Sequence, residues 1–183
     1  MQIEQLPLAG ALLLTPRIFD DARGFFEETY SLDRYRAAGI GETFVQDNLS
    51  LSHRGVLRGL HGDARMAKLV TVVRGSAYDV IVDLRSESPT YRRWCANVLT
   101  AADGRQVYVP RGFLHGFLAL EDETMLSYKQ TAPYDPAAEF SVAWDDPELA
   151  VDWPLEGDGP ILSPRDAANP TLASFVTNGT RPR

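Results

Sequence analysis

Residues 54–68 read Arg-Gly-Val-Leu-Arg-Gly-Leu-His-Gly-Asp-Ala-Arg-Met-Ala-Lys, and this stretch carries most of the information on fold and chemistry. Its first half alternates apolar residues with basic residues and glycines, which is the period-two pattern of a β-strand. We expect the strand to end at His61, because the Gly62-Asp63 pair that follows is a turn signal. Arg58 and Lys68 flank the histidine. The stretch therefore predicts an imidazole beside two cations able to hold an anionic ligand, although a plain strand-end histidine is the simpler alternative.

Short strands separated by turns continue on both sides of this stretch. Expected strands cover residues 44–48, 56–61, 69–74, 77–85, 94–99, 106–109, 113–120, 124–131 and 141–144, with one or two edge strands before residue 20. Turn signals recur about every 8–12 residues, which favours an antiparallel sandwich or barrel over a βαβ fold.

Helical structure is expected in two places only. Ser31 can cap a helix over residues 31–38 and Gly39 can end it. The tail from residue 155 is rich in Pro, Gly and Asp, so we expect a surface wrap with one helical turn near 164–168 and a frayed end at 178–183.

Length and composition narrow the class of protein. The 183 residues suit one domain, 1–183, with a single core. A net charge of −7 argues against nucleic acid as a partner, because phosphate-backbone binding needs a clustered positive surface.

The only cysteine, Cys95, precludes an internal disulfide and favours a reducing cytoplasm. The apolar patch at residues 8–14 is too short to cross a bilayer, so we expect neither a membrane anchor nor a signal peptide.

Residues 77–85 place two carboxylates on one face of an expected strand. Tyr78, Val80 and Val82 form an apolar face, whereas Asp79 and Asp83 point the other way. In a small barrel this second face meets either solvent or a polar lumen, and the segment alone favours solvent.

A second histidine lies in a recognisable turn-and-strand pattern. Residues 110–115, Pro-Arg-Gly-Phe-Leu-His, match the P-x-G-x-x-H signature of the cupin jelly roll, a small β-barrel that houses ligands in its lumen. His115 shares its strand face with Phe113 and Phe117, so a core histidine is the alternative interpretation.

The metal-binding form of this barrel is poorly matched. Metal-binding cupins carry a His-x-His pair in their first motif, whereas this chain has only His61, with Asp63 at the second position. His53 has no partner at ligand spacing. We expect no metal and no other cofactor, while a metal-dependent isomerase or dioxygenase using His61, Asp63 and His115 stays open.

Without a metal, the chemistry falls to His61, His115, Tyr128, Lys68 and the carboxylates. This set suits proton transfer next to a carbonyl group. An imidazole with a pKa of about 6.5 can remove a proton, and a phenol with a pKa of about 10 can return one. A fixed ammonium group can stabilise the enolate formed in between.

Motif blocks spread over residues 19–172 make the chain resemble one enzyme family. They are Asp-Ala-Arg-Gly-Phe-Phe-Glu-Glu at 21–28, Phe-Val-Gln-Asp-Asn at 44–48, Gly-Val-Leu-Arg-Gly-Leu-His at 55–61, Lys-Leu-Val at 68–70, Pro-Arg-Gly-Phe-Leu-His-Gly-Phe at 110–117, Tyr-Lys at 128–129, Trp-Asp-Asp-Pro at 144–147, Asp-Trp-Pro at 152–154 and Leu-Ser-Pro-Arg-Asp at 162–166. In these blocks the sequence resembles the dTDP-4-dehydrorhamnose 3,5-epimerases.

The resemblance implies a metal-free, homodimeric all-β jelly roll that inverts C3 and/or C5 of a nucleotide-diphosphate-linked 4-keto-6-deoxy sugar. It implies His61 as the base, Asp166 as the partner of that base, and Tyr128 as the acid that protonates the opposite face. The implied substrate contacts are Lys68 and His115 at the sugar, Arg23, Glu28, Gln46, Asn48 and Arg58 at the nucleotide and diphosphate, Tyr134 stacked on the base, and Glu139 and Arg165 farther out.

The chain departs from the usual pattern of this family just after His61. Most members continue as His-Tyr-Gln and reach the lysine ten residues later, whereas Gly62-Asp63 follow here and Lys68 comes after seven. A Gly-Asp loop also looks similar to epimerases of GDP-linked 4-keto heptoses. We therefore expect a dTDP-linked substrate, with GDP or another nucleotide left open. A non-catalytic sugar-nucleotide binder is the remaining alternative.

Overall fold

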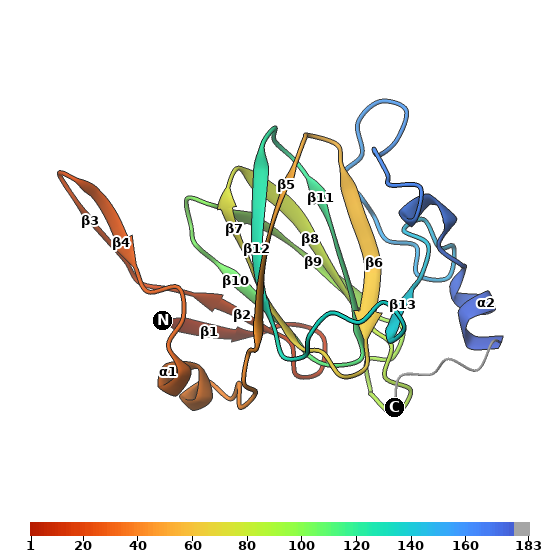
Figure 1. Cartoon of the computed structure of the whole chain (residues 1–183), viewed down its shortest axis with the longest axis horizontal. Helices are drawn as coiled ribbons and strands as arrows, with labels where there is room; N and C mark the ends of the chain where they lie inside the picture. The colour runs from red at the N-terminus through yellow and green to blue at the C-terminus, as the bar shows by residue number, and fades with distance from the viewer. Residues whose placement is uncertain (178–183) are drawn as a thin grey trace.

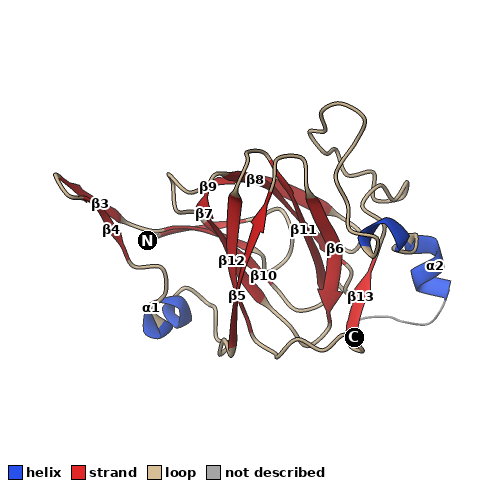
Figure 2. Ribbon diagram, turned by 45° about the horizontal axis from the view of Figure 1, so that its top comes forward, coloured by secondary structure: helices blue, strands red, loops and turns tan. Residues whose placement is uncertain are grey.

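Two antiparallel sheets face each other in the computed structural model, which describes residues 1–177 (Figures 1 and 2). The larger sheet has six strands in the order β1-β2-β10-β7-β12-β5, and the smaller has five in the order β13-β6-β11-β8-β9. A separate hairpin, β3-β4, projects away from this body (Figure 1).

The element bounds agree closely with the strand pattern of the sequence. The strands are β1 (Gln2–Gln5), β2 (Leu12–Thr15), β3 (Ile18–Asp21), β4 (Gly24–Glu27), β5 (Gln46–Ser52), β6 (Leu57–Asp63), β7 (Lys68–Arg74), β8 (Ser76–Asp83), β9 (Trp94–Thr100), β10 (Gln106–Val109), β11 (Phe113–Ala119), β12 (Thr124–Gln130) and β13 (Glu139–Ser141). The helical elements are α1 (Leu32–Ala37), the 3-10 turn η1 (Asp166–Ala168) and α2 (Leu172–Thr177).

Strands β5 to β12 follow jelly-roll order. Four of them, β5, β12, β7 and β10, are neighbours in one sheet, and β6, β11, β8 and β9 are neighbours in the other. Apart from β8 and β9, which pair in the smaller sheet, successive strands from β5 to β12 cross between the facing sheets, which is how this fold encloses a lumen. The predicted all-β, cupin-type jelly roll with short helices is confirmed.

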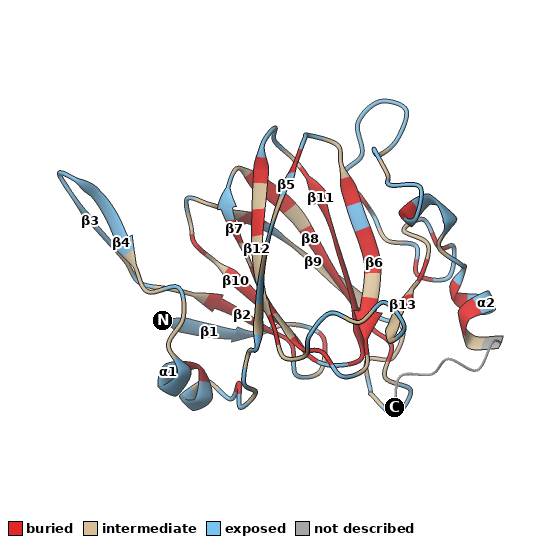
Figure 3. Cartoon of the chain, viewed as in Figure 1, coloured by how far each residue is buried: buried red, intermediate tan, exposed pale blue. Residues whose placement is uncertain are grey.

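Three apolar clusters hold the layers together. One lies between the sheets and includes Val70 from one sheet and Ile81 from the other. A second covers the outer face of the smaller sheet, where Leu114 packs with Trp153 of the C-terminal segment. The third packs Tyr35 of α1 against the larger sheet. Both faces of the smaller sheet are therefore buried, which explains the continuous red of β11 in Figure 3.

Some boundaries differ from the prediction. The hairpin β3-β4 and helix α2 were not expected, β5 lies at 46–52 instead of 44–48, and β13 lies at 139–141 instead of 141–144. The predicted helix 31–38, the helical turn at 164–168 and the edge strands before residue 20 are present. The fraying expected at residues 178–183 lies outside the described residues. Within residues 1–177, no helix has the length and hydropathy needed to cross a membrane.

The predicted turn at Gly62-Asp63 is wrong, because β6 runs through both residues. Strand β13 pairs with this end of β6, with Glu139 opposite Asp63. A Cβ atom on Gly62 would lie 2.5 Å from the carbonyl oxygen of Phe113 and from the Phe140 ring. Gly62 thus permits close packing between strands and does not form a turn.

The solvent interpretation of Asp79 and Asp83 is also wrong. Both carboxylates are buried, since the face they share points between the sheets. Asp83 accepts hydrogen bonds from the Arg85 guanidinium and from the Ser88 and Thr90 hydroxyls, which hold the pKa of that carboxyl below its usual range against the opposing effect of burial. Asp79 contacts His115.

Candidate active site

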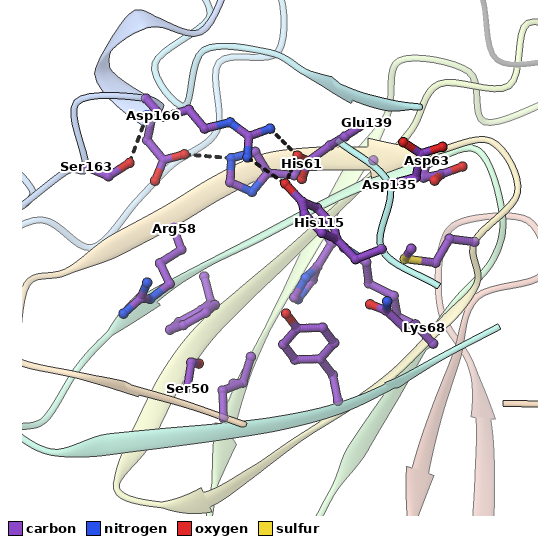
Figure 4. A pocket seen from close by; sticks show the side chains of 18 residues that line it. Ser50, Arg58, His61, Asp63, Lys68, His115, Asp135, Glu139, Ser163 and Asp166 are labelled. Carbon is purple, nitrogen blue, oxygen red and sulfur yellow. Dashed lines mark hydrogen bonds and ion pairs between the residues drawn. The ribbon is translucent and has the colours of Figure 1, made fainter. Parts of the chain in front are cut away.

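A cavity of about 320 Å³ lies between the two sheets and carries most of the predicted site residues (Figure 4). Of the thirteen predicted residues, nine line it: Arg58, His61, Lys68, His115, Tyr128, Tyr134, Glu139, Arg165 and Asp166. Its remaining lining is Ser50, Gly62, Asp63, Met66, Phe117, Leu126, Gln130, Asp135 and Ser163.

A β-bulge in β6 allows two cationic or basic groups of one strand to reach this cavity. His61 pairs with His115 of β11, and Arg58 pairs with Phe117 of the same strand. Three residue steps on β6 thus lie opposite only two steps on β11. Residues three apart on a regular strand face opposite sides, and the extra residue restores Arg58 and His61 to the same side. Gly59 lies in the irregular part, with φ of 140° and no room for a Cβ beside Gly116.

His61 is oriented by a carboxylate from a distant part of the chain. Its Nε2 lies 2.6 Å from Asp166 Oδ1, and Figure 4 shows the ring between that carboxylate and the middle of the cavity. If Asp166 is ionised, Nε2 donates the hydrogen bond and the lone pair of the neutral ring is on Nδ1. Burial lowers the pKa of His61, while the charge of Asp166 opposes that change. The ring is therefore neutral near pH 7 and able to accept a proton.

The segment that carries Asp166 is fastened to the bulged strand. The Asp166 backbone N–H donates to Ser163 Oγ at 3.0 Å, which fixes the start of η1. Asn169, just after η1, donates from Nδ2 to the carbonyl oxygen of Gly59 at 3.3 Å. The irregular stretch of β6 and the turn that supplies the carboxylate are thus held to each other.

Tyr128 and Lys68 enter the cavity from the opposite sheet. Tyr128 lies on β12 beside Val70 of β7, and Lys68 begins β7. The Lys68 ammonium lies 6.0 Å from the centre of the Tyr128 ring. Burial raises the pKa of Tyr128, so its phenol keeps its proton at neutral pH. Burial lowers the pKa of Lys68, and the charges of Glu139, Asp79 and Asp63 oppose that change.

His115 forms a second histidine–aspartate pair deeper in the barrel. Its Nε2 lies 2.6 Å from Asp79 Oδ2, between adjacent strands β11 and β8. Both side chains are buried, and Asp79 Oδ1 has no hydrogen-bond partner among residues 1–177. The ring lines the cavity, as the family resemblance implied, and it is also packed between Phe113 and Phe117 as the core interpretation required.

The donors of the metal alternative are already engaged separately. Asp63 binds the Arg65 guanidinium at 2.7 Å, while His61 and His115 each hold a different carboxylate. Among residues 1–177, no group of three or more His, Cys, Asp or Glu side chains has the arrangement of a metal site. This arrangement does not support the metal-dependent alternative.

An outer group of three side chains borders the cavity mouth. Arg165 pairs with Glu139 and donates from Nη1 to the Tyr134 hydroxyl at 3.2 Å. Gln46 accepts a hydrogen bond from the backbone N–H of Tyr134 and donates one to Asn48 at 2.9 Å. The loop that carries Tyr134 is therefore tied to β5, next to the lining residues.

Arg23 and Glu28 lie away from this cavity. Arg23 is on the projecting hairpin, where it is 89% exposed and paired with Asp21. Glu28 follows the hairpin and pairs with Arg34 of α1. Neither residue reaches the cavity of its own chain.

The unpredicted polar lining residues include Ser50, Gln130, Asp135 and Ser163, and the spacing of the first two could have revealed them. Ser50 is two residues beyond Asn48 on β5, and Gln130 is two residues beyond Tyr128 on β12. Side chains two apart share a strand face, so each should accompany the predicted residue into the lumen.

Comparison with known proteins now identifies the family. A sequence model described as dTDP-4-dehydrorhamnose 3,5-epimerase matches residues 5–174. The chain belongs to this family. A dTDP-4-dehydrorhamnose 3,5-epimerase of Pseudomonas aeruginosa is 44% identical over 176 residues, covering 94% of this chain and 97% of the relative.

Solved structures of dTDP-4-dehydrorhamnose 3,5-epimerases and their relatives share the whole fold. The rmlC epimerase of Mycobacterium tuberculosis superposes with a TM-score of 0.96 at 43% identity, covering 100% of this chain and 94% of that one. The dTDP-6-deoxy-D-glucose-3,5-epimerase of Legionella pneumophila, in complex with dTDP-4-keto-L-rhamnose, superposes at 0.94 with 42% identity, covering 100% and 97%.

The departure of this chain from the usual pattern of the dTDP-4-dehydrorhamnose 3,5-epimerase family just after His61 falls on the cavity. The short segment between His61 and Lys68 contributes Asp63 and Met66 to the cavity lining.

Proposed function

We propose that this protein inverts C3, C5 or both of a nucleotide-diphosphate-linked 4-keto-6-deoxy sugar. The observation that carries the proposal is the meeting of three groups on one cavity: the His61–Asp166 pair from one sheet, and Tyr128 and Lys68 from the other. Family membership supports the reaction class, since the relatives are epimerases.

The reaction begins at His61. The neutral imidazole removes the proton from a carbon next to the C4 ketone, and the bonding electrons move onto the carbonyl oxygen to give an enolate. Asp166 stabilises the imidazolium formed and keeps the ring in one orientation. Lys68, which lines the same cavity beside Tyr128, stabilises the negative charge on the enolate oxygen.

Tyr128 completes the inversion from the other side of the sugar. Its phenol gives its proton to the carbon on the face opposite His61, and the ketone reforms. The tyrosinate then regains a proton from solvent and the imidazolium loses one, so the protein returns to its starting state. Acid and base on opposite sheets account for inversion, whereas a single group would return the proton to the face it came from.

The nucleotide end of the substrate is assigned to the cationic and polar groups beside this centre. Arg58 supplies a guanidinium suited to a diphosphate, and Gln46, Asn48 and Tyr134 form the bonded group at the mouth. Glu139 and Arg165 are assigned as outer contacts, and His115 as a sugar contact. A relative binds a dTDP-linked 4-keto sugar, which makes dTDP the first nucleotide to test.

We further propose that the protein acts as a homodimer. The projecting hairpin is drawn as exposed over most of its length (Figure 3). Phe25 and Phe26 on it are 64% and 69% exposed, which is unusual for two adjacent large apolar side chains on a monomer. Packing this hairpin on a second copy would bury them and would carry Arg23 toward the site of that copy. This arrangement gives Arg23 and Glu28 a nucleotide contact that their own chain does not offer them.

Light scattering on a sizing column tests the assembly. We expect the wild type to elute as a dimer and the double variant Phe25→Ser/Phe26→Ser as a folded monomer with reduced affinity for the nucleotide. An exposed substitution on the same hairpin, Asp20→Ser, is the control. A double variant that stays dimeric would contradict the proposed interface.

A reducing cytoplasm is the location we propose, because the only cysteine is a free thiol on β9. Burial raises the pKa of Cys95 to about 11, so the thiol is protonated and slow to oxidise. Fractionation of the source cells tests this location.

Proton NMR in heavy water with dTDP-, GDP- and CDP-linked 4-keto-6-deoxy sugars tests the reaction. We expect deuterium to appear at C3, C5 or both with the cognate substrate, and the labelled positions report which carbons are attacked. Binding without deuterium incorporation would instead favour the non-catalytic sugar-nucleotide binder.

A further inference from the structure

Two buried polar atoms in the cavity lining have no hydrogen-bond partner in the part of the chain that the structure describes. They are Ser50 Oγ and Gln130 Nε2. Gln130 is only 3% exposed, so bulk water does not compensate its amide. Buried polar groups are nearly always paired in native proteins, and an exception in a binding cavity points to a group that the ligand completes.

The two residues that pair with Gln130 across the sheet do not accept a hydrogen bond from its amide. Its partners across the sheet are Lys68 of β7 and Gln46 of β5. The Gln46 amide is used by Asn48 and by the backbone of Tyr134. The charged form of Lys68, which the carboxylates of Glu139, Asp79 and Asp63 favour, has no lone pair to accept from Nε2.

The turn that precedes Lys68 offers no partner to Gln130 either. Asp63 is held in a two-pronged bond by the Arg65 guanidinium. The Thr131 hydroxyl accepts from the backbone N–H of Ala67. The Met66 side chain, which lines the same end of the cavity, is apolar. The amide donor of Gln130 is therefore left for a ligand.

The position of Gln130 indicates which part of the ligand it meets. The Arg58 guanidinium donates from Nε to Ser52, which lies opposite Thr124 at the start of β12. Gln130 is six residues farther along the same strand, or about 20 Å at 3.3 Å per residue. Tyr128 lies between them, and Figure 4 shows Arg58 and Lys68 on opposite sides of the cavity. Lys68, which pairs with Gln130 across the sheet, is assigned to the enolate oxygen of the sugar. With the diphosphate at Arg58, the Gln130 amide therefore lies at the sugar end, beside a Gln46 side chain whose own bonds go to Asn48 and to the backbone of Tyr134.

We propose that Gln130 is a specificity-determining residue that donates a hydrogen bond from Nε2 to an oxygen of the sugar, beside Lys68. This inference rests on the proposed function for the identity of the ligand. The sugar class favoured by this donor is one that presents a carbonyl or hydroxyl oxygen at this end of the ring. A deoxy sugar that lacks that oxygen leaves the buried amide unpaired and is rejected.

Two substitutions separate this role from a structural one. Gln130→Met keeps the length and volume of the side chain and removes the donor. Gln130→Glu keeps the shape and replaces the donor by an acceptor. Lys129→Ala on the outer face of the same strand, where Lys129 pairs with Asp47, is the matched control.

Calorimetric titration compares the nucleotide diphosphate alone with the nucleotide-linked 4-keto sugar, using the cognate nucleotide of the wild type. We expect Gln130→Met to weaken binding of the sugar nucleotide about tenfold, which corresponds to about 1.4 kcal/mol, and Gln130→Glu to weaken it more. Affinity for the nucleotide diphosphate should stay within twofold. The melting temperature of ligand-free Gln130→Met should equal or exceed that of the wild type, because the removed group had no partner.

Three outcomes would overturn the inference: unchanged sugar-nucleotide affinity, an equal loss for both ligands, or a lowered melting temperature with unchanged ligand preference. Measurements on the wild type separate a failure of the epimerase function from a failure of the Gln130 contact. If it binds the sugar nucleotide but incorporates no deuterium, the epimerase function fails and the Gln130 contact is still decided by the titration. If it binds neither ligand, both fail.

Discussion

The two histidine–aspartate pairs of this protein are equally short but differ in their surroundings. His61–Asp166 and His115–Asp79 both have an N–O distance of 2.6 Å. The His61 side chain is 21% exposed at the cavity, whereas the His115 and Asp79 side chains are 8% and 0% exposed. A short bond to a carboxylate therefore does not by itself identify a catalytic base. The greater exposure of the His61 side chain at the cavity is what favours His61 over His115 as the base.

The pairs also differ in how the chain builds them. Asp79 and His115 come from adjacent strands of one sheet, so the sheet register alone brings them together. Asp166 is 105 residues from His61 and reaches it from the C-terminal segment, held by Ser163 and Asn169. The buried pair is part of the barrel framework. The other pair is assembled across its rim, where a substrate can enter.

The largest expected effect comes from replacing each histidine in turn. His61→Asn should lower the rate of solvent deuterium exchange into the sugar by about a thousandfold or more, since general-base catalysis contributes about 10²–10⁴. His115→Asn should lower it by about tenfold, because we assign His115 to contact with the sugar and not to proton removal. Proton NMR of the cognate substrate in heavy water measures both. Equal losses of exchange rate in the two variants would contradict the assignment of proton removal to His61 and not to His115.

Replacing the carboxylates should give a smaller but parallel difference. Asp166→Asn keeps the shape of the side chain but loses the charge that stabilises the imidazolium, and we expect a loss in exchange rate of about a hundredfold. Asp79→Asn should change the rate by less than about fivefold. If Asp79→Asn is the more damaging of the two, the deeper pair is the one that acts.

Stability should show the opposite ranking. Asp79→Ala leaves a buried imidazole without its partner and should lower the free energy of unfolding by about 1–3 kcal/mol. Asp166→Ala should cost less than Asp79→Ala, because the His61 imidazole that it leaves unpaired is 21% exposed and can be hydrated at the cavity. Urea denaturation of both variants checks the order. A costlier Asp166→Ala would mean that the C-terminal segment is held mainly by this contact.

Much of the fold could be predicted because it depends on local signals. Alternating strands, frequent turns and the P-x-G-x-x-H pattern around His115 indicated a small barrel, and the jelly roll is confirmed. The bulge in β6 could not be predicted in this way, because regular alternation puts His61 on the face opposite Arg58. Gly59 shows its role only when Gly116 of the next strand is beside it.

The remaining misses have related causes. The hairpin β3-β4 has exposed residues on both faces within its own chain, so it lacks the alternation of a half-buried strand. The burial of Asp79 depends on its partner His115 in another strand. That of Asp83 depends on hydrogen-bond donors in the loop that follows β8. The pairing of Asp166 with His61 was expected only from the family resemblance, because no local pattern links residues so far apart in the sequence.

The smallest expected effect is on the pH profile. Burial lowers the pKa of His61 while Asp166 opposes that change. Exchange should therefore rise with pH through an apparent pKa below 6.5, as His61 loses its proton. In Asp166→Asn the opposing charge is gone, so this acid limb should move to lower pH. A limb that moves upward would show that another group controls the rate.

The most direct measurement follows inversion and exchange together in Tyr128→Phe. Because His61 and Tyr128 lie on opposite sheets around one cavity, the variant should still remove and return a proton on the His61 side. We predict exchange of the substrate within about tenfold of the wild type, with the inverted product reduced by about a hundredfold or more. Equal losses of exchange and inversion would contradict the account, since Tyr128 would then not be the acid on the opposite face.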